Sequence, residues 1–497
     1  MSSIPHSSPA ARAGWRLEHS YSLLPDIFYR RVRPVPVAAP RLAVVNRPLA
    51  TSLGLDAEAL AHDSSAGIFS GNDLPDGADP IAQAYAGHQF GHFTPLGDGR
   101  AVLLGEHIST SGARVDVQLK GSGETPFSRN GDGRAALGPM LREYIISEAM
   151  HALGIPTTRS LAVASTGQPV MRQQPLPGAV LTRIAASHIR AGTFEWAAAS
   201  QNKVALQTLA DYTRKRHDPE LDSAANPHLA FLEAVIERQA SLVARWMLVG
   251  FVHGVMNTDN MALSGETIDY GPCAFMEAYD PSTVFSSIDH GGRYAYGNQA
   301  QSAQWNLARL AEAMLPLFDP VEKRALDLAT AAIHSFSDRF DRHWLAGMRA
   351  KLGLFNEEAD DAALIDELLD LMKRERADHT NTFRALSARV PDRSPLLAPP
   401  AFGSWEEKWQ SRLTRQGQSP AESLARRQAH NPVVIPRNHK VEEALAAATS
   451  HSDYSVMNKL LQVVTRPYVT SLDAAPPAEF TEPAAPGSCA YRTFCGT

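Results

Sequence analysis

The order of two hydrophobic patterns along the chain constrains its fold most. Between residues 83 and 190, short apolar or alternating segments are separated by glycines, which is typical of β-strands, and residues 101–105 and 115–120 are the clearest of them. From residue 191 to about 390, apolar residues recur at helical spacing instead. A β-rich part followed by a helical part indicates an α+β fold with two unlike lobes.

One long helix is expected inside the β-rich part, over residues 136–153. Its apolar residues recur at helical spacing, and Gly154 and Pro156 end the pattern. Two further strands are predicted at residues 161–164 and 179–184. Other helical patterns cover residues 229–246, 305–317, 325–336, 357–377, 421–428 and 440–448.

These patterns divide the chain of 497 residues into four parts. We predict an N-terminal extension packed on the core (1–75), a small β-rich lobe (76–190), a helical large lobe (191–390) and a C-terminal helical extension with a cysteine-containing tail (391–497). A Pro-rich run at residues 390–400 forms the boundary between the last two parts.

The charge and apolar content exclude some classes of partner. The formal net charge of -6 argues against a nucleic-acid-binding surface, because such proteins usually carry a basic excess. The longest strongly apolar stretch, residues 246–252, is shorter than the roughly 18 residues that a membrane-spanning helix requires. We therefore expect no nucleic acid, no membrane and a cytoplasmic location. The Ser- and Arg-bearing N-terminus up to Arg16 keeps a mitochondrial transit peptide as an alternative.

A polar motif follows the helix predicted at 229–246. Residues 253–260 read His-Gly-Val-Met-Asn-Thr-Asp-Asn, and Asp-Tyr-Gly follows at Asp269. Protein kinases place a proton-accepting carboxylate five residues before a metal-binding asparagine and use a second metal-binding aspartate further on. Here Asn260 and Asp269 supply the oxygen ligands for a divalent cation, but the position of the base is Val255. Asp259 is the carboxylate in this loop that could replace it.

A glycine turn and a lysine occupy places where a kinase holds phosphate. Gly97, Gly99 and Arg100 precede the strand at 101–105, where close backbone approach and a guanidinium suit a nucleotide; a plain tight turn explains the same glycines. Lys120 ends a strand about twenty residues later, the place from which a kinase lysine reaches phosphate.

The lysine should pair with a carboxylate on the helix at 136–153. Glu143 and Glu148 both lie there, five residues apart and therefore on different faces, so only one of them can point at Lys120. The spacing leaves this choice open.

Further candidates border the same region. Asp132 and Gly133 form a second glycine turn, which would present backbone amides to a phosphate or serve only as a turn. Arg183 and Arg190 flank the end of the last strand, and two guanidinium groups suit a multiply charged phosphate end. We assign His253 a structural role.

The histidines and cysteines offer weaker signals. His88, His92 and His107 lack metal-ligand spacing and receive no site role. The three cysteines are too few for a disulfide framework and lack zinc-site spacing, so we favour independent thiols. A redox role is a secondary hypothesis, because Cys495 lies near the terminus and Cys273 lies just after the metal motif.

Three motifs together resemble the selenoprotein O (YdiU) family of pseudokinases. They are Gln-Leu-Lys-Gly-Ser-Gly at 118–123, the motif at 253–260 with Asp-Tyr-Gly at 269–271, and Thr-Phe-Cys-Gly-Thr at 493–497. The resemblance extends from about residue 18 to the terminus. It implies a kinase-like bilobal fold and ATP bound in an inverted orientation. It also implies transfer of AMP to Ser, Thr or Tyr hydroxyls of protein substrates.

The resemblance also implies roles for residues. Lys120, Arg183 and Arg190 would hold the pyrophosphate end of ATP, Glu143 rather than Glu148 would pair with Lys120, and Asp259 would take the acceptor proton. Asn260 and Asp269 would bind Mg²⁺ or Mn²⁺. The nucleotide would also contact Gly97, Gly99, Arg100, Asp132, Gly133 and Asp269.

At the tail, the family often has selenocysteine where this chain has Cys495. The resemblance implies a disulfide between Cys495 and Cys273, whereas the replacement of selenium by sulfur puts redox potency in doubt.

Several activities compete with AMP transfer. They are UMP transfer from UTP, ordinary phosphoryl transfer with Asp259 as the base, and a catalytically silent nucleotide-binding scaffold. Val255 disfavours the phosphotransferase, because valine cannot accept a proton. The presence of both metal ligands, Asn260 and Asp269, disfavours the scaffold.

Overall fold

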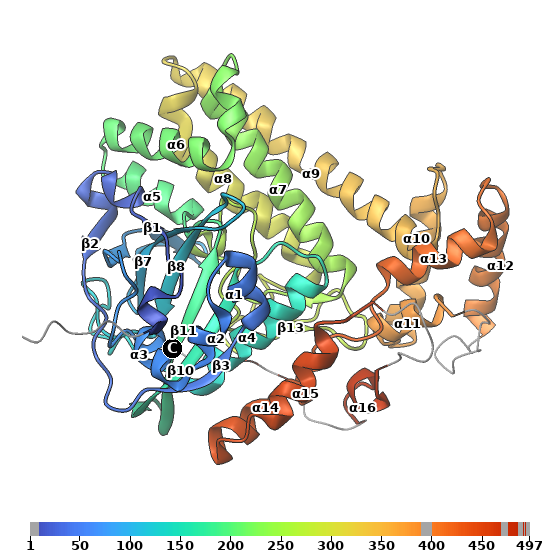
Figure 1. Cartoon of the computed structure of the whole chain (residues 1–497). Coiled ribbons are helices and arrows are strands. Elements are labelled where there is room, and N and C mark those ends of the chain that lie inside the picture. The colour runs from blue at the N-terminus through green and yellow to red at the C-terminus, as the bar shows by residue number, and fades with distance from the viewer. Residues whose placement is uncertain (1–8, 389–399, 469–475, 486–490, 492, 494–497) are drawn as a thin grey trace, which may run out of the picture.

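An antiparallel sheet covered by helices forms the centre of the computed structural model, which describes residues 9–388, 400–468, 476–485, 491 and 493 (Figure 1). The main sheet has nine strands within these residues. In spatial order they are β2 (Tyr29–Arg31), β4 (Ile81–Gln83), β7 (Ala101–Ile108), β8 (Arg114–Lys120), β11 (Pro175–Ala185), β10 (Arg159–Met171) and β3 (Arg41–Val45), with β1 (Leu17–Glu18) beside β7 and β9 (Ala135–Ala136) beside β11. Two small sheets pair β5 (Ala86–Gln89) with β6 (His92–Pro95), and β12 (Phe251–Val252) with β13 (Ala274–Phe275).

The pairing of β8 with β11 gathers polar residues on one face of the main sheet. Arg183 lies opposite Gln118, and Leu181 lies opposite Lys120. Directly opposed residues of antiparallel strands point to the same face, as do residues two apart along one strand. Gln118, Lys120 and Arg183 therefore share a face.

Helix α4 (Leu137–Ala152) packs against β10 and β11 and is buried on all sides. Every residue from Met140 to Met150 is buried, because α14 (Asn438–His451) and α15 (Ser455–Val464) cover the side of α4 that faces away from the sheet. Gly154 follows the helix in the left-handed conformation at φ 75°, which ends it as expected. The helix predicted at residues 136–153 is confirmed.

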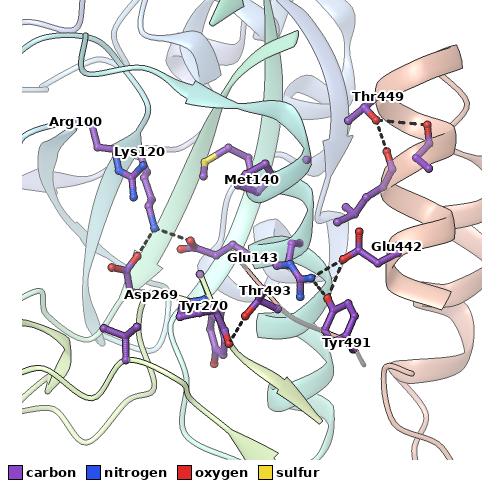
Figure 2. A pocket seen from close by; sticks show the side chains of 18 of the residues that line it. Arg100, Lys120, Met140, Glu143, Asp269, Tyr270, Glu442, Thr449, Tyr491 and Thr493 are labelled. Atoms are coloured by element: carbon purple, nitrogen blue, oxygen red, sulfur yellow. Dashed lines mark hydrogen bonds and ion pairs between the residues drawn. The ribbon is translucent and has the colours of Figure 1, made fainter. Parts of the chain in front are cut away.

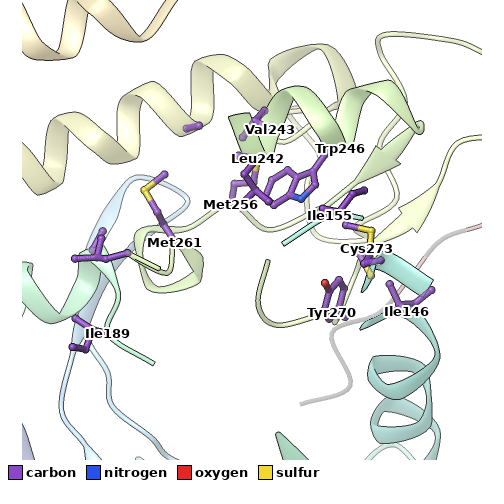
Figure 3. Packing of buried hydrophobic residues seen from close by; sticks show 14 of the residues in the cluster. Ile146, Ile155, Ile189, Leu242, Val243, Trp246, Met256, Met261, Tyr270 and Cys273 are labelled. Carbon is purple, nitrogen blue, oxygen red and sulfur yellow. The ribbon is translucent and has the colours of Figure 1, made fainter. Parts of the chain in front are cut away.

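Five helices follow the sheet in sequence and pack mainly against one another (Figure 1). Trp246 and Leu242, on the apolar face of α7 (Pro227–Leu248), lie in the same buried cluster as Met256 of the next loop (Figure 3). The Trp246 Nε1–H also donates to Thr267 Oγ1 at 2.8 Å, which ties α7 to the loop before Asp269. The helices are α5 (Ala191–Ala199), α6 (Lys203–His217), α7 (Pro227–Leu248), α8 (Gln299–Phe318) and α9 (Glu322–Leu352).

The remaining helices lie near the two ends of the chain. Near the N-terminus are α1 (Arg47–Leu53), α2 (Ala57–Ala61) and α3 (Ala66–Ser70). The C-terminal part has α10 (Asp361–Arg374), α11 (His379–Ala385), α12 (Pro400–Thr414), α13 (Pro420–His430), α14 (Asn438–His451), α15 (Ser455–Val464) and α16 (Ala478–Thr481). Across the part of the chain that the structure describes, no helix is long and apolar enough to cross a membrane.

The structure confirms the predicted mixture of β-rich and helical parts, and every predicted strand and helix has a counterpart. Several elements were missed: β3, for example, joins the main sheet beside β10 although its segment lies in the predicted N-terminal extension. Helix α9 also continues well past residue 336, where its predicted pattern ended. Most of the Pro-rich run, 389–399, lies outside the described residues.

Candidate active site

Two cavities meet where the main sheet, α4 and the loop after α7 come together. The glycine-turn cavity, of about 470 Å³, is bordered by the turns at 97–99 and 131–133. The α4–α14 cavity, of about 690 Å³, lies between those two helices (Figure 2). Both volumes fall in the range of ligand-binding pockets. Residues that line both cavities are Arg100, Lys120, Val255, Asn260 and Asp269.

The glycine-turn cavity collects nearly all the predicted site residues. Glu143 lines the α4–α14 cavity instead. The predicted residues around the glycine-turn cavity are Gly97, Gly99, Arg100, Lys120, Asp132, Gly133, Arg183, Arg190, Asp259, Asn260 and Asp269.

Two cations and two carboxylates form an ion-pair cluster at the sheet face. The Lys120 Nζ donates to Glu143 Oε2 at 2.7 Å and also to Asp269 Oδ1 (Figure 2). Arg183 donates to Glu143 Oε1 through Nε at 2.8 Å and through Nη2 at 2.5 Å, and its Nη2 lies 3.3 Å from Asp269 Oδ1. Glu143 thus holds both cations beside Asp269.

The cluster keeps both carboxylates ionised. Burial acts to raise the pKa of Glu143, but the charges of Arg183 and Lys120 outweigh it and lower the pKa. The same two cations outweigh burial at Asp269 and hold its pKa well below the usual range. The backbone of Asp269 is in the left-handed region at φ 69°, which few non-glycine residues adopt and which is enriched at functional sites.

The geometry settles which glutamate pairs with Lys120. Glu148 lies on another face of α4, where Arg159 donates to it through Nε at 2.8 Å and Nη2 at 2.6 Å. Glu143 is the partner of Lys120.

Arg190 connects the sheet to the loop that carries Asp259. It precedes α5, is 4% exposed, and donates from Nη1 to the Asp259 backbone carbonyl at 2.8 Å. Its guanidinium lies over the Tyr85 ring, 4.5 Å from the centroid, and 4.0 Å from Asp98 Oδ1. Burial raises the pKa of Asp98 to about 6 even with this arginine nearby.

The Asp259 carboxyl is buried at the wall of the glycine-turn cavity. Burial raises its pKa to about 6, against the opposing effect of Arg190. Its Oδ1 has no hydrogen-bond partner within the described residues. A carboxyl with this pKa is ionised at neutral pH and remains basic enough to accept a proton.

Asn260 and Asp269 fit a hard divalent cation. Asn260 Nδ2 donates to the Val255 carbonyl at 3.0 Å, and its Oδ1 is buried without a hydrogen-bond partner in the ranges that the structure covers. Those ranges contain no group of three or more His, Cys, Asp or Glu side chains arranged for a metal. Two protein oxygens suit Mg²⁺, which usually completes its coordination with nucleotide phosphates and water.

The glycines of the two turns have a packing role of their own. A Cβ on Gly133 would lie 2.1 Å from the backbone of Gly123, and a Cβ on Gly99 would lie 2.8 Å from the carbonyl oxygen of Phe127. Close packing therefore requires these glycines whether or not a ligand binds. The side chain of Asp132 is turned toward Arg172, whose Nη1 donates to it at 2.8 Å.

The structure confirms a structural position for His253, whose ring contacts the Ile268 carbonyl at 2.9 Å. Cys273 is buried and has no disulfide partner within the described residues, and burial raises the pKa of its thiol to about 12, which keeps the thiol protonated at neutral pH. Cys489 and Cys495 lie outside the described residues. The predicted pairing of Cys273 with Cys495 stays a prediction.

A set of hydrogen-bonded polar residues next to Asp259 was not predicted from the sequence. Glu195 of α5 accepts from Thr258 Oγ1 at 2.7 Å and contacts His88 Nδ1 at 2.8 Å. Asn257 Oδ1 accepts from the Phe90 backbone N–H at 3.0 Å. The clustering of Asn and Thr around Asp259 was the available signal, but their partners lie far away in sequence.

Known proteins resemble this chain along nearly its whole length. Residues 14–465 match the family described as "Protein adenylyltransferase SelO". The "Protein nucleotidyltransferase YdiU" of Geobacillus kaustophilus (strain HTA426) is 59% identical over 485 residues, which cover 98% of this chain and 100% of the relative. Proteins of the same name from Bacillus cytotoxicus and Syntrophotalea carbinolica are 58% and 57% identical over 484 residues, with 97% of this chain and 98% of each relative covered. The chain therefore belongs to the SelO family of protein adenylyltransferases and is a nucleotidyltransferase.

Proposed function

We propose that the protein transfers AMP from ATP to Ser, Thr or Tyr hydroxyls of other proteins and releases pyrophosphate. One observation carries the proposal. The aliphatic Val255 lines the cavity where a kinase has its base, whereas Asp259 lines the same cavity and has a buried Oδ1 without a hydrogen-bond partner among the described residues. The carboxylate that can act as the base is thus Asp259 rather than residue 255. This different position supports transfer at the α-phosphate instead of the γ-phosphate, within a kinase-like bilobal fold.

Lys120, Arg183 and Arg190 are the groups that we assign to the pyrophosphate end of ATP. All three are buried, at 6%, 2% and 4% exposure, and all line the glycine-turn cavity. Arg100 adds a further positive charge, which helps to lower the pKa of Asp269. Fixed cations in a partly enclosed site stabilise the negative charge that develops on a leaving pyrophosphate.

This assignment favours an inverted ATP. With the terminal phosphates against the buried cations, the α-phosphate can face Asp259 and the incoming acceptor. Gly97, Gly99, Asp132 and Gly133 then border the rest of the nucleotide, since they line the same cavity.

We assign the cation to Asn260 and Asp269, with Mg²⁺ or Mn²⁺ as the ion. A bound divalent cation supplies charge neutralisation on the phosphate oxygens. The protein groups do the rest: Asp259 accepts the proton of the hydroxyl, and the hydroxyl oxygen bonds to the α-phosphorus. The bond between the α-phosphorus and the bridging oxygen breaks, and its electrons leave with pyrophosphate.

Radiolabel position tests this function. The purified protein is incubated with Mg²⁺ or Mn²⁺ and a protein acceptor, with ATP labelled at the α- or the γ-phosphate. We expect protein-bound label from the α position alone, and its loss with Asp259→Asn. Label from the γ position alone would establish the phosphotransferase, and no label with intact ATP binding would establish the scaffold. UTP labelled at the α position, run in parallel, tests UMP transfer.

Two glutamates of one helix provide a matched control. Glu143→Gln removes the charge that holds Lys120 and Arg183, whereas Glu148→Gln makes the same change where the partner is Arg159. We expect AMP transfer to fall only in Glu143→Gln. An equal fall in both variants would point to damage of α4 rather than to the ion-pair cluster.

A further inference from the structure

We propose that Glu195 is a positioning residue, which acts through Thr258 to fix the loop that carries Asp259 and Asn260. The catalytic part of this inference rests on the proposed function, in which those two residues hold the acceptor proton and the cation. The structural part stands on the contacts between α5, the β5–β6 hairpin and the loop.

Three hydrogen bonds close a ring directly before Asp259. Thr258 Oγ1 donates to Glu195 Oε2 at 2.7 Å and accepts from the His88 backbone N–H at 2.7 Å. The His88 ring closes the ring of contacts through Nδ1, 2.8 Å from Glu195 Oε1. One hydroxyl thereby uses its donor and an acceptor site at once, so its position is fixed from two sides.

A second set of hydrogen bonds fixes the position of Asn257, the residue before Thr258. Asn257 Oδ1 accepts from the Phe90 backbone N–H at 3.0 Å and from the Tyr294 hydroxyl at 2.7 Å. The hairpin therefore holds Asn257 and Thr258, the two residues before Asp259, and the short 3₁₀ turn Thr258–Asn260 continues from them.

Loss of these hydrogen bonds costs free energy because their partners are buried. Thr258 is 0% exposed and Glu195 is 5% exposed, so water cannot readily replace a missing partner. Loss of the Thr258 hydroxyl would leave a buried carboxylate oxygen short of a donor and the His88 N–H without its acceptor. The loop would then relax away from the hairpin, and Asp259 and Asn260 would move with it.

Nucleotide binding should depend less on this ring of bonds than turnover does. Of the cations assigned to the phosphates, Lys120 and Arg183 are held by Glu143, whereas Arg190 contacts the Asp259 carbonyl. A positioning role therefore predicts a loss of turnover without a matching loss of ATP affinity. A general destabilisation would reduce both.

The test compares Thr258→Val, which keeps the shape and removes the hydroxyl, with Thr258→Ser, which keeps the hydroxyl. We expect kcat for AMP transfer to fall by about tenfold or more in Thr258→Val and to recover in Thr258→Ser, with a smaller change in the Kd for ATP and a modest fall in the Tm. Glu195→Ala should behave as Thr258→Val. Glu195→Gln, which can still accept from Thr258, should retain most of the activity.

Amide hydrogen exchange measures the hydrogen bond between the His88 amide and Thr258 independently of catalysis. The His88 amide should exchange faster in Thr258→Val than in Thr258→Ser, while the Phe90 amide, bonded to Asn257, changes less. Unchanged kcat and His88 exchange in Thr258→Val would overturn the inference, and so would a parallel fall in ATP affinity. If the wild-type protein transfers no AMP, the proposed function fails, and the exchange data still decide whether Glu195 and Thr258 fix the loop.

Discussion

A single methyl group at residue 87 tests the placement of Asp259. Gly87 lies in β5, and a Cβ there would stand 2.4 Å from Asp259 Oδ1, 2.8 Å from its Cβ and 2.9 Å from its Cγ. Ordinary van der Waals contact begins near 3.4 Å, so the carboxylate oxygen must retreat by about 1 Å. Rotation of the side chain cannot relieve the contact at Cβ, and therefore the loop itself must move.

The expected effect is large on rate and moderate on stability. Displacement of a reacting group by about 1 Å can lower a rate by about 10²-fold. Insertion of a methyl group into a packed site costs about 1–3 kcal/mol of unfolding free energy. We therefore expect Gly87→Ala to stay folded, to bind ATP, and to lose about two orders of magnitude in kcat for AMP transfer.

The assay is steady-state transfer of α-labelled AMP, together with ATP binding and thermal unfolding. Gly417→Ala is the control, because Gly417 is exposed and a Cβ there would meet no atom of the described residues within 4 Å. That variant should match the wild type in all three measurements. A folded Gly87→Ala protein with wild-type kcat would refute the assignment of Asp259 as the proton acceptor.

Three further predictions concern pH, charge and thiol reactivity. Because the pKa of Asp259 is raised to about 6, its carboxyl is protonated below pH 6, and the transfer rate should fall there about tenfold per pH unit. A flat pH–rate profile from pH 5 to pH 7 would contradict this expectation. Asp269→Asn should weaken metal-dependent ATP binding, measured by calorimetry with and without Mg²⁺. If the wild-type protein binds ATP with equal affinity with and without Mg²⁺, the assigned cation site is wrong. Cys273, buried with its pKa raised to about 12, should resist iodoacetamide at pH 8 until urea unfolds the protein; rapid native labelling of the Cys273 peptide by mass spectrometry would show that it is accessible.

Local spacing was enough to predict the motif residues. Val255, Asn260 and Asp269 lie within one short stretch, and their order along the chain carries the chemistry. The apolar face of α7 was equally readable, because a helix repeats its buried positions every three to four residues. The structure places both features where the spacing indicated.

Spacing along the sequence could not predict contacts between distant segments. Thr258 and His88 are 170 positions apart, and Thr258 and Glu195 are 63 apart, so no local pattern links them. The choice of Glu143 over Glu148 depends on which face of α4 meets β8 and β11, which tertiary packing decides. Asp98, in the turn between Gly97 and Gly99, is 1% exposed beside Arg190, and no local pattern indicated this burial.

The packing of α14 on α4 has a consequence for how the protein is made. Arg142, directly before Glu143, donates to Glu442 at 2.6 Å and to the hydroxyl of Tyr491, across 300 and 349 positions of the chain. A ribosome that has synthesised all the residues assigned to the chemistry has therefore not yet supplied the surface that covers α4, the helix of Glu143. Nascent chains that stop before α14 would expose the apolar side of α4. The packing of the helix that carries Glu143 would thus be completed late in translation.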